Sequence, residues 1–323
     1  MLRIYSAGEK RATIVGDFAT GSLPPGAVWL DLVEPTKEEE TFVERVAGIG
    51  VPTRDEMVEI EPSSRLYRDG DAIVVIASLV AGSDGEAPIT TPVSFVLTPA
   101  LLITIRYAEP KVFEVFSAHV ERSTVLCSDA AATLIHLLDA IVDRMADVLE
   151  KIGEEMDNIS KSTFRRNHAS QTRMTNTALA VLLGRIGHAQ DIVSKSRVSA
   201  VSIARVLSFL GGTLDRKGTK EHLDGLARDV ASLTDHASYL GGNITFLLDS
   251  ALGLINIEQN ATIKIFSVAA VIFMPPTLVA SIYGMNFHFM PELSFTYGYP
   301  MALGIMISSA ILPYMFFKNR GWL

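Results

Sequence analysis

The sequence predicts an α+β fold: an α/β sandwich with long antiparallel helices, joined by a long stalk helix to a two-helix transmembrane hairpin. Three observations support this prediction. Short strand-like segments and turn signals dominate residues 1–127. Proline is absent between Pro110 and Pro275, where apolar residues recur at helical spacing. Between Ile265 and Phe317 the only formally charged side chain is Glu292, in a chain whose residues are 20% charged.

Residues 1–127 are expected to form a small α/β subdomain. Thr36 with Glu39 forms a capping-box pattern that opens a short helix, and Thr53 with Glu56 suggests another. No glycine-rich phosphate loop, Cys/His cluster or nucleophile elbow stands out. Isolated acids, namely Asp31, Glu34 and Asp69, are predicted to be solvated surface groups. Segments rich in β-formers predict strands at Val28–Leu32, Ala72–Val80, Val93–Leu97 and Leu101–Arg106.

Residues 128–212 are expected to form an antiparallel helical hairpin. A first helix begins at Ser128 or Asp129 and runs to about Ser162, and a turn follows at 165–168. The second helix covers about 170–209, and Gly211–Gly212 ends it. Acids at helical spacing form either a solvated face or a stripe that attracts divalent cations or a neighbouring subunit's basic groups: Asp139, Asp143, Asp147, Glu150, Glu154 and Asp157.

The third helix is expected to run from 219 to 283. A heptad seam from Leu223 to Leu254 favours a supercoiled bundle. At 1.5 Å per residue the helix would be about 95 Å long, which exceeds the thickness of a bilayer, so its first part is predicted to be a stalk. Gly241–Gly242 leaves open a break in this helix.

Two apolar runs predict membrane spans at about 264–283 and 299–317, with an external loop at 284–298. Lys264 precedes the first span, and a basic tail at 318–323 follows the second, whereas the loop has no Lys or Arg. The positive-inside rule therefore places both termini in the cytoplasm. The alternative is a buried helical hairpin in a soluble core.

Composition excludes several classes of function. The formal net charge is −8, which argues against a nucleic-acid partner and suits a protein that handles cations. Cys127 is the single cysteine, so no intramolecular disulfide is expected. The N-terminus lacks the apolar segment of a signal peptide. No catalytic constellation and no cofactor site stand out, so an enzyme is not expected.

A stripe of polar, small or flexible residues follows one face of the third helix into the first span. Polar residues in a span usually face a bundle interior or water. One hairpin has no interior, so several copies would have to surround an axis, and the stripe would line a pore; helix packing through small residues is the alternative. The stripe comprises Asp249, Gly253, Asn256, Asn260, Ile263, Ser267, Ala270, Met274, Thr277 and Ser281.

Gly284-Met285-Asn286 stands at the outer end of this span. Glycine permits a helix-ending conformation, and asparagine supplies a neutral amide. A ring of neutral oxygens can hydrogen-bond hydrated Mg²⁺, an ion that releases its waters reluctantly. Glu292 in the loop could raise the local cation concentration.

These segments resemble the CorA family of Mg²⁺ channels. The resemblance rests on Tyr283-Gly284-Met285-Asn286-Phe287 together with four flanking motifs and the C-terminal Gly321-Trp322-Leu323. It covers about the last seventy residues specifically and the rest loosely. The flanking motifs are Gly253–Asn260, Phe273–Leu278, Met290–Leu293 and Tyr297–Pro300.

The resemblance implies a homopentameric funnel in the cell inner membrane that transports Mg²⁺, with Co²⁺ and often Ni²⁺ accepted. It assigns the outer selectivity ring to Gly284–Asn286, the inner polar ring to Asp249, pore lining to Asn260, Met274 and Thr277, and hydrophobic constrictions to Ile263 and Phe266.

Family members are closed by cytoplasmic Mg²⁺ bound at acidic sites between subunits. Here Gly225 occupies a position where an acid is expected, which leaves Asp224 and Asp229 as neighbouring candidates. Two alternatives stay open: a Zn²⁺ or Ni²⁺ transporter of the same superfamily, and a two-span membrane-anchored sensor or scaffold.

Overall fold

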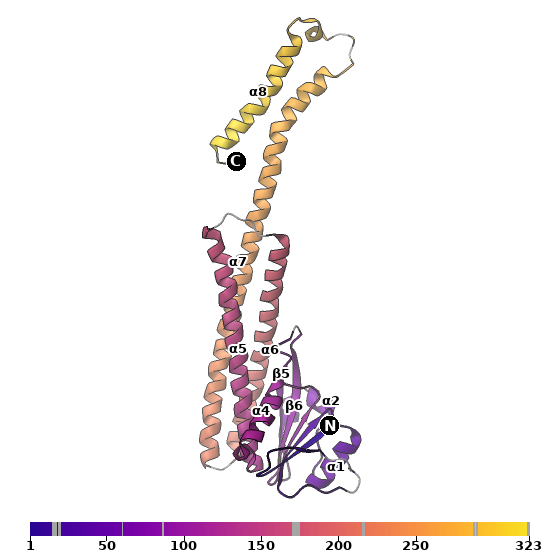
Figure 1. Ribbon diagram of the computed structural model, residues 1–323, viewed down its shortest axis with the longest axis vertical. Helices are drawn as coiled ribbons and strands as arrows, with labels where there is room; N and C mark the ends of the chain where they lie inside the picture. The colour runs from indigo at the N-terminus through magenta and orange to yellow at the C-terminus, as the bar shows by residue number, and fades with distance from the viewer. Residues whose placement is uncertain are drawn as a thin grey trace. The chain divides into compact units, whose positions relative to one another are not determined.

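The computed structural model in Figure 1 describes residues 1–14, 18, 21–59, 61–85, 87–169, 175–214, 217–286, 288 and 290–321. The chain divides into two compact units. The first comprises 1–171 and 180–248 and holds the sheet and most of the helices. The second comprises 172–179 and 249–323.

A seven-stranded mixed sheet organises the first unit, in the order β2-β1-β3-β7-β6-β5-β4. Strands β3 and β7 are parallel, and the other neighbours are antiparallel. All four predicted strands are confirmed, and β1, β2 and β4 are additional. The strands are β1 Leu2–Ser6, β2 Thr13–Ile14, β3 Ala27–Val33, β4 Leu66–Asp69, β5 Ala72–Ala81, β6 Ile89–Leu97 and β7 Leu102–Arg106.

Helices cover both faces of this sheet. Helices α1 (Lys37–Ala47) and α2 (Arg54–Val58) pack on one face, and both predicted capping boxes are present at Thr36 and Thr53. Helix α4 (Lys111–Arg122), which the sequence analysis did not predict, packs on the other face with the long helices. The sheet therefore has a hydrophobic core on each side. The short helix α3 (Pro62–Arg65) precedes β4.

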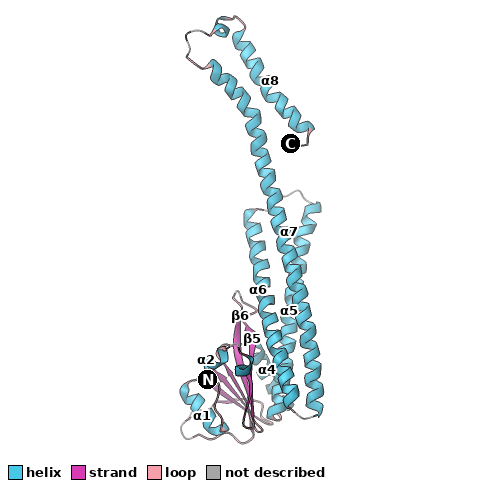
Figure 2. Cartoon of the chain, turned by 180° about the vertical axis from the view of Figure 1, so that it is seen from behind, coloured by secondary structure: helices cyan, strands magenta, loops and turns pink. Residues whose placement is uncertain are grey.

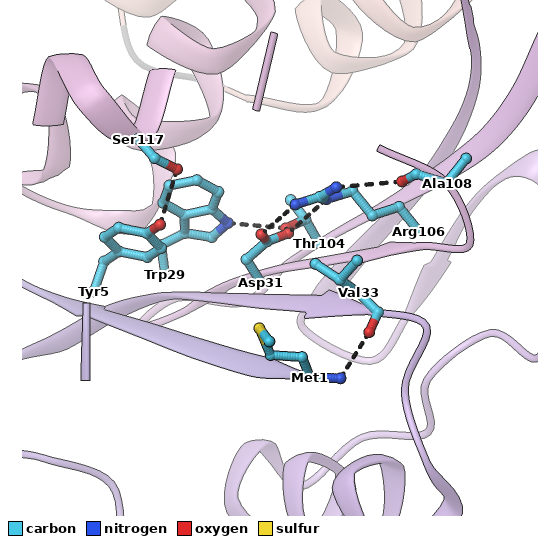
Figure 3. A network of polar contacts seen from close by, with 9 residues as sticks. All are labelled: Met1, Tyr5, Trp29, Asp31, Val33, Thr104, Arg106, Ala108 and Ser117. Atoms are coloured by element: carbon cyan, nitrogen blue, oxygen red, sulfur yellow. Dashed lines mark hydrogen bonds and ion pairs between the residues drawn. The ribbon is translucent and has the colours of Figure 1, made fainter. Parts of the chain in front are cut away.

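Asp31 is fully buried, so its prediction as a solvated group is wrong. Its carboxylate accepts hydrogen bonds from Arg106 Nε at 3.2 Å and Nη2 at 2.9 Å, and from Thr104 Oγ1 at 2.7 Å. Trp29 Nε1 donates to Thr104 Oγ1 at 3.0 Å, which extends the network in Figure 3. Because helices cover both faces of the sheet, a polar side chain on β3 has no solvent to face.

Three long helices run alongside one another in the first unit (Figure 2). They are α5 (Ala130–Ala169), α6 (Asn176–Thr213) and α7 (Lys217–Tyr283), of which α7 continues into the second unit. Asp129 Oδ1 accepts from Ala132 N at 2.9 Å, as expected for the predicted start of α5. Buried apolar side chains include Leu134, Leu138, Ile141, Met145, Leu149 and Ile152 on α5 and Leu223, Leu226 and Val230 on α7.

One predicted helix end is wrong. The residues from 165 to 168 are helical and belong to α5, because they include neither glycine nor proline and arginine is a good helix former. The end predicted at Gly211–Gly212 agrees with the structure to within one residue, since α6 ends at Thr213. The break left open at Gly241–Gly242 is absent, since α7 is helical throughout.

The second unit contains the end of α7, the short helix η2 (Pro291–Ser294) and α8 (Gly298–Asn319). Figure 1 shows α8 returning antiparallel to the end of α7. The most apolar windows of α7 and α8 have mean hydropathies of 2.1 and 1.6, and 6% of each window is buried in the chain. Such exposure disagrees with the alternative of a hairpin buried in a soluble core.

Candidate ion-conducting site

The polar stripe predicted on α7 lies on the face that α8 leaves uncovered. Val268 on the opposite side of α7 is 3% exposed, and Ala302 on α8 is 7% exposed. Half-buried positions of α7 share the side of Val268: Ala261, Lys264, Ile272, Pro275, Val279 and Tyr283. By contrast, all the stripe residues from Asn256 to Ser281 are exposed: Asn256, Asn260, Ile263, Ser267, Ala270, Met274, Thr277 and Ser281.

The inner end of the stripe carries its only formal charge. Asp249 is exposed, and Gly253 on the next turn is half-buried. The predicted constriction residues, Ile263 and Phe266, are 61% and 70% exposed. Apolar residues of this size, one to two turns beyond Asn260, can narrow a path between facing helices, whereas Asp249 and Asn256 can attract and solvate a cation.

The Pro275–Pro276 pair leaves two backbone oxygens of α7 without their usual helical donors, on the side of Ile272 and not on the stripe. Pro275 and Pro276 lack the N–H groups that would bond the carbonyls of Val271 and Ile272 in an α-helix. Thr277 Oγ1 donates to the Phe273 carbonyl at 2.7 Å. The sequence analysis did not single out these carbonyls, although a Pro-Pro pair inside a predicted helix is a sufficient signal, since it frees the oxygens four residues earlier.

Gly284 directly follows α7, and its backbone still donates to Ala280 O at 2.9 Å. A Cβ added here would lie 3.2 Å from that same oxygen, a tight contact that would require a shift of a few tenths of an ångström. The prediction that Gly284 adopts a special helix-ending conformation finds no support, since its φ is not positive. Met285 N donates to Ile282 O at 3.2 Å, which turns the chain at the helix end.

Asn286 is exposed at the end of this turn, and Met285 is 46% exposed. The described part of the chain therefore presents the Asn286 amide to solvent just beyond the last turn of α7. His288 is exposed in the same loop. The side chain of Glu292, the proposed cation attractor, lies outside the described residues, as do Phe287 and Phe289.

The two candidate regulatory acids, Asp224 and Asp229, are both exposed on α7. Burial, followed by the charges of Asp139, Asp147 and Asp229, raises the pKa of Asp143 on α5. The acidic face of α5 thus lies close to Asp229. Nevertheless, the described residues include no group of three or more His, Cys, Asp or Glu side chains able to hold a metal ion.

Comparison with known proteins extends the resemblance over the whole chain. Residues 25–319 match the model of a family described as CorA-like Mg²⁺ transporter protein. The magnesium transport protein CorA of Pasteurella multocida is 35% identical over 324 residues, covering 100% of both chains. That of Escherichia coli K12 is 34% identical over 298 residues, covering 92% of each.

Among solved structures, the CorA magnesium transporter of Methanocaldococcus jannaschii has a similar fold. It aligns with a TM-score of 0.75 at 19% identity, covering 100% of this chain and 99% of that one. This agreement confirms the predicted architecture of an α/β domain, a long stalk helix and C-terminal apolar helices.

Proposed function

Because the chain belongs to the CorA family of Mg²⁺ transporter proteins, a family of membrane transporters, we propose that it is a homopentameric channel for hydrated Mg²⁺ that also accepts Co²⁺ and Ni²⁺. Five copies of α7 would surround the pore, with the stripe facing the axis. Gly284, Met285 and Asn286 would form the outer selectivity ring, and Asp249 the inner polar ring. Glu292 would attract cations to the outer entrance.

One observation carries this proposal: the polar face of α7 is the face that α8 does not cover, and the Asn286 amide stands at its outer end. Within the span this face carries the hydroxyls of Ser267, Thr277 and Ser281, and Asn256 and Asn260 continue it before the span begins. Polar side chains in a span usually face a bundle interior or water and not lipid. Additional copies of α7 and water between them would supply those surroundings.

The neutral amide ring suits a strongly hydrated ion. Mg²⁺ keeps several waters in most protein sites, and amide oxygens can accept hydrogen bonds from those waters without holding the ion as tightly as carboxylates do. The stripe contains neither cysteine nor histidine, the side chains that typically bind Zn²⁺. Its lining therefore suits Mg²⁺ better than Zn²⁺.

The membrane potential would drive influx. At −100 mV a divalent cation gains about 4.6 kcal/mol on entering the cell, so the transport needs no nucleotide hydrolysis. We place both termini in the cytoplasm, because Lys264 and the basic residues after α8 flank the spans on that side and the loop between the spans has no Lys or Arg. In a bacterial cell this corresponds to the inner membrane.

We further propose that cytoplasmic Mg²⁺ closes the channel by binding near Asp224 and Asp229. Support comes from the position of Asp143, whose pKa is raised first by burial and then by the charges of Asp139, Asp147 and Asp229. A divalent cation would relieve the repulsion among these acids. Mg²⁺ bound between acids of α5 and α7 would then favour one arrangement of these helices over another.

Mg²⁺ uptake into proteoliposomes that contain the purified protein tests the function. We expect uptake that increases with an inside-negative potential and that Co²⁺ and Ni²⁺ inhibit. Stronger uptake of Zn²⁺ than of Mg²⁺ would favour a zinc transporter of the same superfamily. Absence of any cation flux, in protein shown to be folded and assembled, would favour a membrane-anchored sensor or scaffold.

A further inference from the structure

Three arginines of the first unit line one cavity of about 440 Å³: Arg65 at the end of α3, and Arg197 and Arg205 on α6. The two arginines of α6 are eight residues apart and share a face with Val201, which lies midway between them. Strand β5 contributes Ile76 and Ser78 to the opposite wall. No carboxylate is among the described residues that line this cavity.

Hydrogen bonds fix the positions of Arg65, Ser78 and Ser202 in the wall of this cavity. Arg65 Nη1 donates to Ser78 Oγ at 3.0 Å, and Arg65 Nε donates to the Glu59 carbonyl. The Ser78 backbone N–H donates to Ser202 Oγ at 2.9 Å, which joins β5 to α6. These contacts hold Arg65 opposite Arg205 without neutralising either one.

Arg65 is half-buried, whereas Arg197 and Arg205 are exposed to solvent. None of the three forms an ion pair within the described part of the chain, although the chain has 36 acidic residues and a net charge of −8. Burial, and then the charge of Arg205, lowers the pKa of the Arg65 guanidinium. The guanidinium groups of Arg65 and Arg205 therefore repel one another, and a bound multivalent anion would relieve that repulsion.

A second cavity adjoins the first and shares Leu66, Val201 and Arg205 with it. It is a shallow groove, open to solvent, of about 760 Å³, and combines apolar side chains with Thr234 and Asp235 of α7. Its apolar members include Ala204, Phe209 and Ala231. A suitable ligand would have a phosphate group at one end, to contact the arginines of the first cavity. At the other end it would have a planar organic group with hydrogen-bond donors, to contact the apolar side chains and Asp235 of the second.

We propose that these adjoining cavities bind a nucleoside di- or triphosphate. The phosphates would lie against Arg65, Arg197 and Arg205, because guanidinium groups bind phosphate oxygens in pairs. The base and sugar would occupy the second cavity, where Asp235 can accept hydrogen bonds from an amino or hydroxyl group. Both volumes lie within the usual range for small-molecule sites. This site does not depend on the proposed ion conduction.

The test is binding of ATP, inorganic triphosphate and adenosine to the full-length protein in detergent, measured by titration calorimetry in Mg²⁺-free buffer. We expect ATP and triphosphate to bind and adenosine not to bind. Each of Arg197→Gln and Arg205→Gln should weaken ATP binding about 10- to 100-fold, as is usual for loss of a charged hydrogen-bonded contact. Asp235→Asn should weaken the binding of ATP but not of triphosphate.

Arg185→Gln is the matched control. Arg185 also lies on α6, but it pairs with Glu155 at 3.1 Å and does not line the cavity, so this variant should bind ATP as tightly as the unmodified protein. The proposal is overturned if neither ATP nor triphosphate binds. It is also overturned if Arg185→Gln weakens binding as much as Arg197→Gln and Arg205→Gln do.

A labelling experiment shows whether a second copy of the chain covers this face instead. Val201 is 39% exposed, and the single native cysteine, Cys127, is 1% exposed, so a Val201→Cys thiol can be labelled selectively. We expect a charged maleimide to react with Val201→Cys in the assembled protein and ATP to slow the reaction. A thiol that reacts only after unfolding would overturn the proposal in favour of a subunit interface.

Discussion

Arg106 and Asp31 form an ion pair that is almost completely enclosed, with side-chain exposures of 2% and 0%. They belong to the parallel strands β7 and β3. The guanidinium carbon also lies 4.4 Å from the centre of the Phe113 ring on α4. The pair thus joins the middle of the sheet to the helix that covers it. Two further hydrogen bonds support the pair, from Thr104 Oγ1 to the Asp31 carboxylate and from Arg106 Nη1 to the Ala108 carbonyl.

Asp31→Ala should lower the free energy of unfolding of the α/β domain by about 3–5 kcal/mol. The substitution leaves the Arg106 charge buried without a counter-charge, and this penalty exceeds the value of the lost contact itself. Urea unfolding followed by the fluorescence of Trp29, which lies in the same network, measures the change.

Asp69→Ala is the control for this experiment, because Asp69 is exposed at the end of β4 and should change stability by less than about 0.5 kcal/mol. The double variant Asp31→Leu/Arg106→Met removes both charges and should be more stable than Asp31→Ala alone. Equal effects of Asp31→Ala and Asp69→Ala would show that the buried pair contributes little.

The burial of Asp31 could not be predicted from the sequence, because its partner Arg106 is 75 residues away. The features that the sequence predicted correctly depend only on residues close together in the chain. They are the capping boxes at Thr36 and Thr53, the four central strands and the apolar spans. The Asp31 environment depends on two helical layers that meet over the sheet. One of them includes α4, whose existence the sequence analysis missed.

The helix ends and the candidate site also combine features that neighbouring residues predict with features that depend on the packing of distant segments. Gly211–Gly212 is a local stop signal, and α6 ends at the next residue, Thr213. The turn predicted at 165–168 is instead helical and belongs to α5. In the candidate site, helical spacing predicts the stripe, and the Gly284-Met285-Asn286 motif marks the outer end of the span. Which side of α7 remains uncovered depends on where α8 packs, and spacing alone does not specify that.

Gly212→Ala should stabilise the protein by at most about 0.5–1 kcal/mol, because Gly212 is helical, one residue from the end of α6, and alanine loses less backbone entropy on folding. A Cβ at Gly212 meets no atom within 4 Å. Gly82→Ala provides the contrast, since its φ of +69° disfavours alanine and the new Cβ would lie 3.3 Å from the Ala87 carbonyl. Opposite shifts in the thermal unfolding midpoint are expected, and two shifts of the same sign would contradict this reasoning.

Asp84 should stabilise the first unit at neutral pH and lose this effect in acid. Hydrogen bonds from Lys111 and Lys151, and the charge of Arg144, lower the pKa of Asp84 from 3.8 to about 2. A carboxyl whose folded pKa is lowered contributes stability above its unfolded pKa, and the contribution disappears as the pH falls from about 4 towards 2.

Urea unfolding midpoints measured from about pH 6 down to about pH 2 test this prediction, because this range spans the unfolded and folded pKa values of Asp84. The difference between the unmodified protein and Asp84→Asn should be constant above about pH 5 and shrink towards zero near pH 2. A difference that does not change over this range would mean that the three cations do not act through the Asp84 charge.

Millimolar Mg²⁺ on the cytoplasmic side should lower the open probability of the channel. Asp229→Asn should weaken this inhibition more than Asp224→Asn, because the charge of Asp229 acts on the Asp143 carboxyl of α5. Single-channel currents in planar bilayers, recorded with increasing Mg²⁺ on one side, measure the effect. Currents that are insensitive to Mg²⁺ on both sides would remove the gating proposal while leaving the conduction proposal intact.

Asn286→Ala should reduce Mg²⁺ uptake into proteoliposomes to the level of empty liposomes, because alanine supplies no oxygen to receive hydrogen bonds from the waters of the ion. Asn286 is exposed, so the loss of its side chain should leave folding and oligomer mass unchanged. His288→Ala, an exposed position in the same loop, should keep normal uptake. Asn286→Asp should bind divalent cations more tightly and release them more slowly, which would appear as a lower maximal flux with stronger inhibition by Co²⁺. Full uptake by Asn286→Ala would remove the amide ring from the mechanism, whatever the behaviour of the rest of the stripe.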